Sequence, residues 1–286
     1  MVIFVLLDNS INKPFYKNSN VMWKLIKRLF LALVIIAIAG VGALWFILKG
    51  STTTNRNNYE RIEDISTPRG FVRITGSDPA FTTYLRSLPL KPKGSHVMLC
   101  TGGKASMQFM AYAVVDLPLL SNDEQCADCC MRLRGEYLYQ TRQYGRIRFT
   151  DVNGNILRYE GGASRKSFES YMRRVYGVAS TYSLRHSLAQ RELSDIEPGD
   201  VFVYAAGSTK MGVKMAMGHA IMVVDVAENS EGKRVFLLAE GSTPAQDIHL
   251  MRNVTSPLRS PWYSLDDWAD RHMLSMLFDD DELRHW

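Results

Sequence analysis

The sequence predicts an α+β domain in which an antiparallel sheet packs against a cysteine-bearing helix, together with one N-terminal transmembrane helix. Three observations predict this fold class. Residues 29–48 form an uncharged apolar run, helical patterning recurs between residues 121 and 190, and short β-branched or aromatic segments dominate residues 200–251. The chain has 286 residues, of which 46% are hydrophobic and 22% are charged. This ordinary globular composition excludes collagen-like, low-complexity and wholly disordered chains.

Residues 29–48 (LFLALVIIAIAGVGALWFIL) are predicted to be an uncleaved signal anchor, since about 20 apolar residues cross a bilayer. Residues 45–47 (WFI) stand where a signal peptidase needs small side chains, which disfavours a cleaved signal peptide, and the length disfavours a buried core helix. Five basic residues precede the run: Lys13, Lys17, Lys24, Lys27 and Arg28. The positive-inside rule therefore keeps residues 1–28 in the cytoplasm and places the chain after Lys49 outside the inner membrane, facing the periplasm or the exterior. Translation could start at Met1 or at Met22.

Three segments are expected after the anchor. Residues 49–66 are polar and lack apolar periodicity, which predicts a stalk. Residues 67–275 are predicted to be the exported α+β domain. Residues 276–286 are acidic and are expected to be a solvated terminus. The formal charge of +5 does not indicate a nucleic-acid partner, and the chain has no phosphate-loop, dinucleotide or zinc-protease motif.

Apolar patterning predicts the elements of the exported domain in order. Strands are expected at residues 71–75, 96–100, 107–117, 200–204, 219–226, 234–240 and 247–251. Helices are expected at residues 121–144, 164–176 and 181–190, with a short one after Ser264. Ser121 and Glu124 fit a capping box, which would place Cys126 about one turn into its helix. Asn153-Gly154 predicts a hairpin within residues 146–160.

Cys126, His219 and Glu240 are the candidate catalytic residues. Cys126 lies near the start of a helix, where amide groups lower the pKa of a thiol, and His219 opens a strand. A turn at residues 229–232 would pair His219 with Ser242 and place Glu240 diagonal to the imidazole on the same face of the sheet. Glu240 could then orient the imidazole, as the third member of a nucleophile–base–orienter triad does. Two flanking glycines would permit close backbone approach: Gly218 and Gly241.

The order of these motifs resembles the NlpC-type cell-wall cysteine peptidases of the papain-like superfamily. The resemblance spans residues 119–251 and rests on a helix-borne cysteine followed by PGDVFVY (198–204), GHAIMVV (218–224) and LLAEGS (237–242). It implies a papain-like fold in which Cys126 is the nucleophile, His219 the base and Glu240 the orienter. It also implies an acyl-enzyme, a cell-wall peptide such as peptidoglycan as substrate, and no cofactor.

The exported part also resembles a bacterial family that is defined only as a domain of unknown function. This second resemblance is closer, and it rests on the CAD helix with MRLRGEYLY (131–139) and on PAQDIH (244–249). It implies no established activity.

Three further residues are candidate substrate-binding groups. Gln125 precedes the cysteine and could donate to an oxyanion, as a glutamine does in papain-like enzymes generally. Gln246 and Asp247 could replace Glu240 as orienters if Glu240 faces away, and His249 could face either the cleft or solvent. Arg132 and Glu136 are spaced as a structural i,i+4 ion pair.

Several alternatives stay open. Cys126 could be an ordinary buried thiol, and the domain could be a non-catalytic binding module or a scaffold subunit of the cell envelope. Four cysteines are too few for a disulfide scaffold, although export would allow Cys100 to bridge to a helix cysteine. A metal site is not expected, because the cysteines at 126, 129 and 130 lack a second ligand pair.

Overall fold

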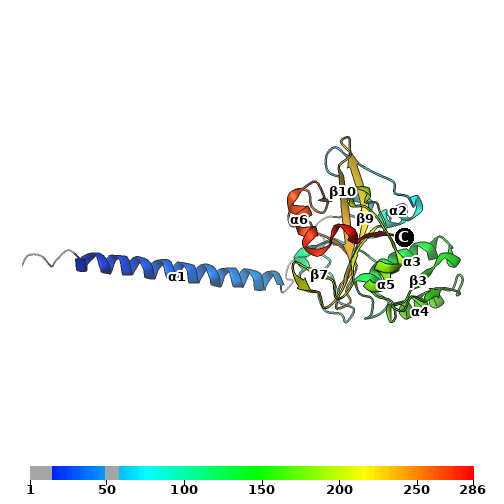
Figure 1. The fold of residues 1–286 in the computed structure, drawn as a ribbon, viewed down its shortest axis with the longest axis horizontal. Helices are drawn as coiled ribbons and strands as arrows, with labels where there is room; N and C mark the ends of the chain where they lie inside the picture. Colours follow the sequence, from blue (N-terminus) through cyan, green and yellow to red (C-terminus); the bar gives the residue numbers. More distant parts are fainter. Residues whose placement is uncertain (1–14, 49–57) are drawn as a thin grey trace, which may run out of the picture. The chain divides into compact units, whose positions relative to one another are not determined.

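The computed structural model describes residues 15–48 and 58–286, with side chains from residue 22 to residue 42 in the first range (Figure 1). The chain divides into two units, residues 1–49 and 50–286, which are described separately. The first 14 residues of the predicted cytoplasmic segment, and residues 49–57 of the predicted stalk, lie outside the described residues.

The described part of the first unit is one helix, α1 (Phe15–Leu48), which begins well before the predicted boundary at residue 29. Its stretch Met22–Gly42 has a mean hydropathy of 2.3 and is long and apolar enough to cross a membrane. This helix is compatible with a membrane anchor, and a signal sequence near the N-terminus has the same length and composition.

The second unit is built on a mixed α+β core, as predicted, with a large antiparallel sheet. Along the main path of the sheet the strand order is β2-β11-β10-β9-β6-β13-β5. The strands on this path are β2 (Ala111–Val114), β5 (Ala189–Gln190), β6 (Val201–Tyr204), β9 (His219–Asn229), β10 (Arg234–Glu240), β11 (His249–Met251) and β13 (Leu283–His285). Two short strands lie off this path: β1 (Phe71–Arg73) pairs with β9, and β12 (Tyr263–Ser264) pairs with β10.

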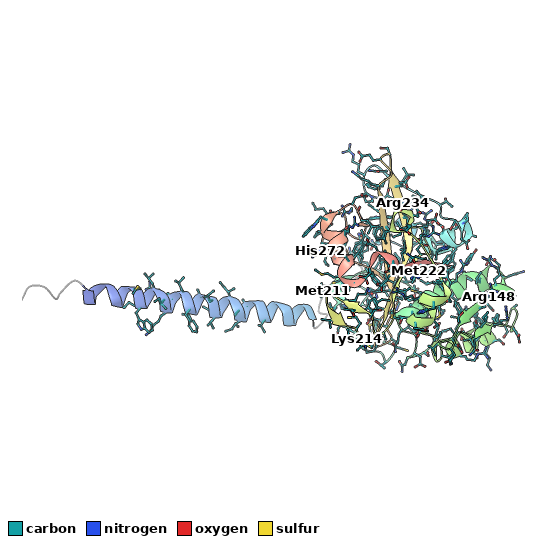
Figure 2. The ribbon with its side chains drawn as sticks, viewed as in Figure 1. Arg148, Met211, Lys214, Met222, Arg234 and His272 are labelled. Carbon is teal, nitrogen blue, oxygen red and sulfur yellow. The ribbon has the colours of Figure 1, made fainter. Side chains whose placement is uncertain are left out.

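Side chains along the central strands point alternately to the two faces of this sheet, and both faces are buried. On β9, Met222 and Val224 belong to one core cluster, whereas Ile221 and Val223 belong to the other. The first cluster contains residues of α2 (Pro79–Arg86), α3 (Cys126–Gln140), α4 (Arg165–Tyr176) and α5 (Thr181–Ser187); the second contains Leu274 of α6 (Trp268–Leu277). Figure 1 shows α6 and α3 on opposite sides of the β9–β10 ribbon, and Figure 2 shows Met222 near the middle of the unit.

Most of the predicted elements are confirmed with shifted ends. Strand β10 has the predicted bounds, Ser164 caps α4, and Gly154 adopts a φ of 86° in the turn between β3 (Arg148–Thr150) and β4 (Ile156–Arg158). The helix predicted at residues 181–190 ends at Ser187. A small hairpin of β7 (Thr209–Lys210) and β8 (Val213–Lys214) precedes β9.

Two predicted strands are wrong or shortened. Residues 96–100 form only isolated bridges, such as Leu99 with Gln246. Residues 108–110 form a 3-10 helix, so the buried strand predicted at 107–117 is reduced to the four residues of β2. Apolar composition predicted these strands, but an apolar run does not specify hydrogen-bonded partners.

The predicted boundaries of the domain are also corrected. Ile62 and Ile65 are 0% and 1% exposed and join the first core cluster, so the end of the predicted stalk is part of the domain. At the other end, Leu283 is fully buried and β13 pairs with both β6 and β5. The predicted acidic tail is therefore part of the sheet. Its acidic residue Glu282 can be buried there because it forms ion pairs with Lys210 and Arg185.

A cysteine at a helix N-terminus beside a histidine–glutamate pair

Helix α3 begins at Cys126, which corrects the predicted start at Ser121. Gln125 is the N-cap residue, and its backbone N–H donates to the carboxylate of Asp128 at 3.1 Å. Glu124 does not complete a capping box with Ser121, because its buried carboxylate instead accepts from Leu120 N–H at 2.7 Å and pairs with a nearby arginine. Cys126 thus lies in the first turn, where backbone amides have no helical carbonyl partner and the helix dipole is strongest.

The β9–β10 hairpin brings His219 and Glu240 together in the predicted register. At the site end of the hairpin Ala239 pairs with Met222, and Leu238 with Val223, while a bulge at Leu237 shifts the remaining pairs by one residue. His219 Nε2 lies 2.8 Å from Glu240 Oε2. Nδ1 is therefore the ring nitrogen left for another partner.

Cys126 acts on the same imidazole. Burial lowers the pKa of His219, but hydrogen bonding to Cys126 and to Glu240, together with their charges, outweighs burial and raises the pKa to about 10. His219 also packs against two aromatic rings, with centroids 6.4 Å away for Tyr204 and 6.3 Å for Phe278. The three candidate catalytic residues are thus brought together from α3, β9 and β10.

Glu240 lies between two imidazoles. Its Oε1 is 3.5 Å from His249 Nε2, in addition to the contact of Oε2 with His219. Burial raises the pKa of Glu240, but hydrogen bonds to His219 and His249 outweigh it and lower the pKa to about 2. His249 is 3% exposed, and its Nδ1 lies 3.1 Å from the carbonyl oxygen of Asp247. His249 therefore contacts the orienting carboxylate rather than solvent.

Two glycines allow the helices to reach this pair of strands, as predicted. A Cβ at position 241 would lie 2.1 Å from Sγ of Cys129, so α3 packs directly on the backbone that follows Glu240. A Cβ at position 218 would lie 2.1 Å from Oγ1 of Thr181, at the first residue of α5. Close approach at these two positions sets the distance from the helices to the site.

Cys126 borders a cleft of about 550 Å³. The thiol-bearing residue is 7% exposed, and Tyr176, Tyr182, Met217 and Thr243 contribute to the walls. This volume lies within the range of small-molecule and peptide sites. Met217 comes from the segment between β8 and β9.

The other cysteines have different surroundings. Cys129 and Cys130 are each 1% exposed, and burial raises the pKa of both thiols well above the ordinary range. Cys100 is exposed, and all four cysteines are free. Cys126 is therefore the cysteine that combines a cleft with a histidine partner. No group of three histidine, cysteine or acidic residues within the described part of the chain could hold a metal ion.

Of the three candidate substrate-binding residues, Gln125 lines the cleft, whereas Gln246 and Asp247 do not. The Oε1 atom of Gln125 accepts a 2.7 Å hydrogen bond from Thr243 Oγ1. Asp247 is 5% exposed, and its carboxylate accepts from Lys91 at 2.8 Å and from Met98 N–H at 2.9 Å. Gln246 is half-buried and forms the bridge with Leu99. Because Glu240 faces His219, neither Gln246 nor Asp247 is needed as its substitute.

Asp128 is a cleft residue that sequence reasoning missed. It is 6% exposed, and its Oδ1 has no hydrogen-bond partner among the described residues. Burial raises the pKa of this carboxyl to about 8. The signal for Asp128 is its position three residues after Gln125, which is the N3 position of a helix whose N-cap is Gln125. That position can be recognised only when the helix is known to start at Cys126.

A buried ion network fixes the rest of α3. The predicted pair of Arg132 and Glu136 is confirmed at 2.7 Å, with both side chains 1% exposed. Glu124 lies 3.2 Å from the same guanidinium, and Arg165 of α4 lies 2.7 Å from Glu136. The network ties the loop before Cys126 to the helix that carries it.

The fold and the site define an α+β domain that presents a helix-terminal cysteine to a histidine–glutamate pair. The chain belongs to the family described as domain of unknown function (4846), whose model matches residues 62–163 and 158–285. This match confirms the predicted resemblance to a family of unknown function. Neither curated protein sequences nor solved structures give a significant match.

Proposed function

We propose that this chain is a membrane-anchored, exported cysteine hydrolase of papain-like topology that cleaves an amide bond in a peptide of the cell envelope. The observation that carries the proposal is the grouping of three side chains: Cys126, at the start of α3 and in the wall of the cleft, acts on His219, and Glu240 lies 2.8 Å from His219 Nε2. This is the order of nucleophile, base and orienter.

The electrostatics support a protonated His219. A histidine whose pKa is about 10 stays protonated through neutral pH. Glu240, whose pKa is about 2, remains a carboxylate and balances the imidazolium charge. The first-turn position of Cys126 adds the partial positive charge of the helix N-terminus.

The reaction would use Cys126 and His219. The Cys126 thiolate attacks the amide carbonyl carbon and forms a C–S bond. His219 passes its proton to the leaving amine as the C–N bond breaks, which leaves a thioester. Water then attacks the thioester while His219 accepts its proton, so the acid is released and the thiolate is restored.

Donors for the developing oxyanion are available beside the nucleophile. The first backbone amides of α3 have no helical acceptor, and the contact with Thr243 orients the Gln125 side-chain amide at the rim of the cleft. Gln125 thus supports the predicted role of an oxyanion donor.

The apolar stretch of α1 supports the anchoring part of the proposal. With basic residues before it, the positive-inside rule assigns the domain to the periplasm or the exterior, where peptidoglycan or another envelope component is the substrate class.

The test is the pH dependence of iodoacetamide labelling of Cys126 in the purified chain in detergent. The exposed Cys100 would also react, so Cys100→Ser serves as the background, and Cys100→Ser/Cys126→Ala serves as the blank. We expect fast labelling below about pH 7 that falls at least about tenfold in His219→Ala.

Labelling that rises only near about pH 8–9, equally with and without His219, would match an ordinary thiol and would contradict the hydrolase. A non-catalytic binding domain would then be the better reading. Glu240→Gln offers a second variant, because it keeps the size of the side chain and removes its charge.

A further inference from the structure

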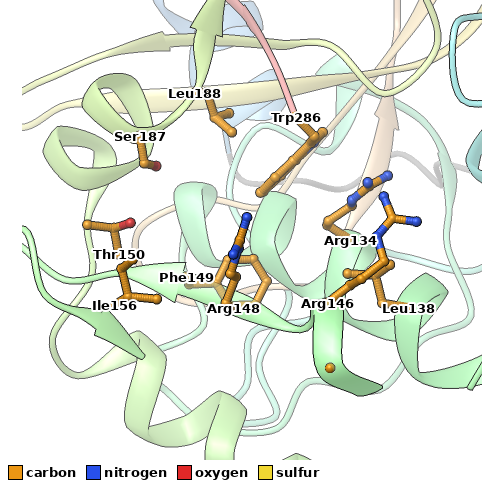
Figure 3. Close-up of a pocket in the computed structure, with 11 residues that line it drawn as sticks. Arg134, Leu138, Arg146, Arg148, Phe149, Thr150, Ile156, Ser187, Leu188 and Trp286 are labelled. Atoms are coloured by element: carbon orange, nitrogen blue, oxygen red, sulfur yellow. The ribbon is translucent and has the colours of Figure 1, made fainter. Parts of the chain in front are cut away.

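A second pocket, here called the arginine pocket, is lined by three arginines and by apolar side chains (Figure 3). Its volume is about 510 Å³. The residues that carry the argument are Arg134, Arg146, Arg148, Phe149, Leu188 and Trp286. None of them lines the cleft beside Cys126, so this pocket is a separate feature of the domain.

The three arginines come from three different elements. Arg134 belongs to α3, Arg146 to the short 3-10 helix at Tyr144–Arg146, and Arg148 to β3. Arg134 is 7% exposed and is fixed by an ion pair with Asp78 at 2.9 Å. The side chain of Arg146 donates to Gln143 Oε1. The sequence thus brings cationic groups together from separated positions and holds two of them in place.

The positive charge of the pocket is only partly balanced by acidic side chains. Asp78 neutralises Arg134, but no acidic side chain lines the pocket, and neither Arg146 nor Arg148 has an ion pair within the described part of the chain. Burial lowers the pKa of Arg134, the hydrogen bond and charge of Asp78 act against it, and the charge of Arg146 is a smaller lowering effect. The like charges of Arg134 and Arg146 therefore repel each other.

The third arginine lies on the β3–β4 hairpin. Arg148 is paired with Arg158, but the two residues line different pockets. Figure 2 places Arg148 at the periphery of the domain, and Figure 3 shows its guanidinium group pointing toward Trp286 and Leu188. A bound anion would balance the positive charge of Arg146 and Arg148 in this pocket.

We propose that the arginine pocket binds an organic phosphate monoester. A phosphate monoester carries about two negative charges, which match the charges of Arg146 and Arg148, the two arginines without an ion pair. It also has three acceptor oxygens, one for each of the three guanidinium groups. A carboxylate offers one charge and two oxygens. The walls formed by Phe149, Leu188 and Trp286 would hold the organic part of the ligand.

The probe is phenyl phosphate, titrated calorimetrically into the purified chain in a non-ionic detergent. We expect saturable binding that is at least about tenfold tighter than that of inorganic phosphate, and no binding of phenol. Arg148→Gln is expected to weaken the binding about tenfold or more. Cys126→Ala should leave it unchanged, which separates this site from the proposed hydrolase.

Arg158→Gln is the matched control, because it removes the same charge from the partner strand at a residue that lines a different pocket. Equal losses in Arg148→Gln and Arg158→Gln would indicate diffuse attraction and would overturn the site. Absence of binding at about 10 mM phenyl phosphate would also overturn it, and equal affinity for inorganic phosphate would overturn the assignment of an organic ligand.

Discussion

The sulfur of Cys129 occupies the space that a side chain on Gly241 would need, since a Cβ there would lie 2.1 Å from Sγ. Gly241 directly follows Glu240, and Cys129 lies one turn after Cys126 on α3. The contact therefore determines how closely the helix that carries the cysteine approaches the strand that carries the orienting carboxylate.

Gly241→Ala should push α3 away from β10. We expect a loss of about 1–3 kcal/mol in the free energy of unfolding, measured by urea denaturation, and slower labelling of Cys126. Gly145→Ala is the control, because a Cβ at that position meets no atom within 4 Å. An unchanged stability in Gly241→Ala would show that the helix can shift without cost.

The His219–Glu240 pair predicts a window of pH in which the fold is most stable. The pKa of His219 is raised from 6.5 to about 10, so its contribution is complete below about pH 6.5 and is lost as the pH rises through 10. The pKa of Glu240 is lowered from 4.5 to about 2, so its contribution is complete above about pH 4.5 and is lost as the pH falls through 2.

Both contributions are therefore complete between about pH 4.5 and 6.5. The difference in free energy of unfolding between the wild-type chain and His219→Gln should be largest there and should shrink steadily toward pH 10. Urea denaturation at several pH values measures it. A difference that does not vary with pH would mean that His219 contributes by packing alone.

The buried ion network on α3 predicts an asymmetric response to substitution. Arg132→Met should cost about 3–5 kcal/mol, because it leaves Glu124 and Glu136 as buried charges without that partner. Replacing all three residues with apolar ones should recover part of the loss. Lys233→Met removes a fully exposed ion pair with Glu231 and should change stability little.

Cys100 offers a test of the proposed orientation, because it is exposed while the other three cysteines are buried. In spheroplasts, a maleimide that does not cross membranes should label Cys126→Ala through Cys100 and should fail to label Cys100→Ser/Cys126→Ala. Labelling that appears only after lysis would place the domain in the cytoplasm and would contradict export.

The parts of the site that follow local rules were predictable from sequence. The NSEG turn and the alternation of apolar residues specify the β9–β10 register, which brings Glu240 to His219. Gly218 and Gly241, which lie beside His219 and Glu240, indicated that helices approach closely there. These features depend on hairpin geometry and on the absence of a Cβ, and both can be recognised in a short window of sequence.

The start of α3 and the ends of the domain could not be predicted in this way. Glu124 matched a local capping pattern, but its carboxylate is buried against Arg132, eight residues later. Glu282 looked solvated, but Lys210 neutralises it from a distant hairpin. In both cases an ion pair with a residue far along the chain overrides the local preference, and single-sequence patterns do not report such partners.

The position of β13 has a consequence for how the domain is made. Residues 283–285 fill the place between β6 and β5, while residues 71–73 pair with the far end of β9. A nascent chain that has emerged only as far as α6 has therefore left an open edge on β6, and it cannot close the sheet until residue 285 is available. A chain that lacks residues 283–285 would therefore present β6 as an unpaired edge strand, and such edges are prone to aggregate.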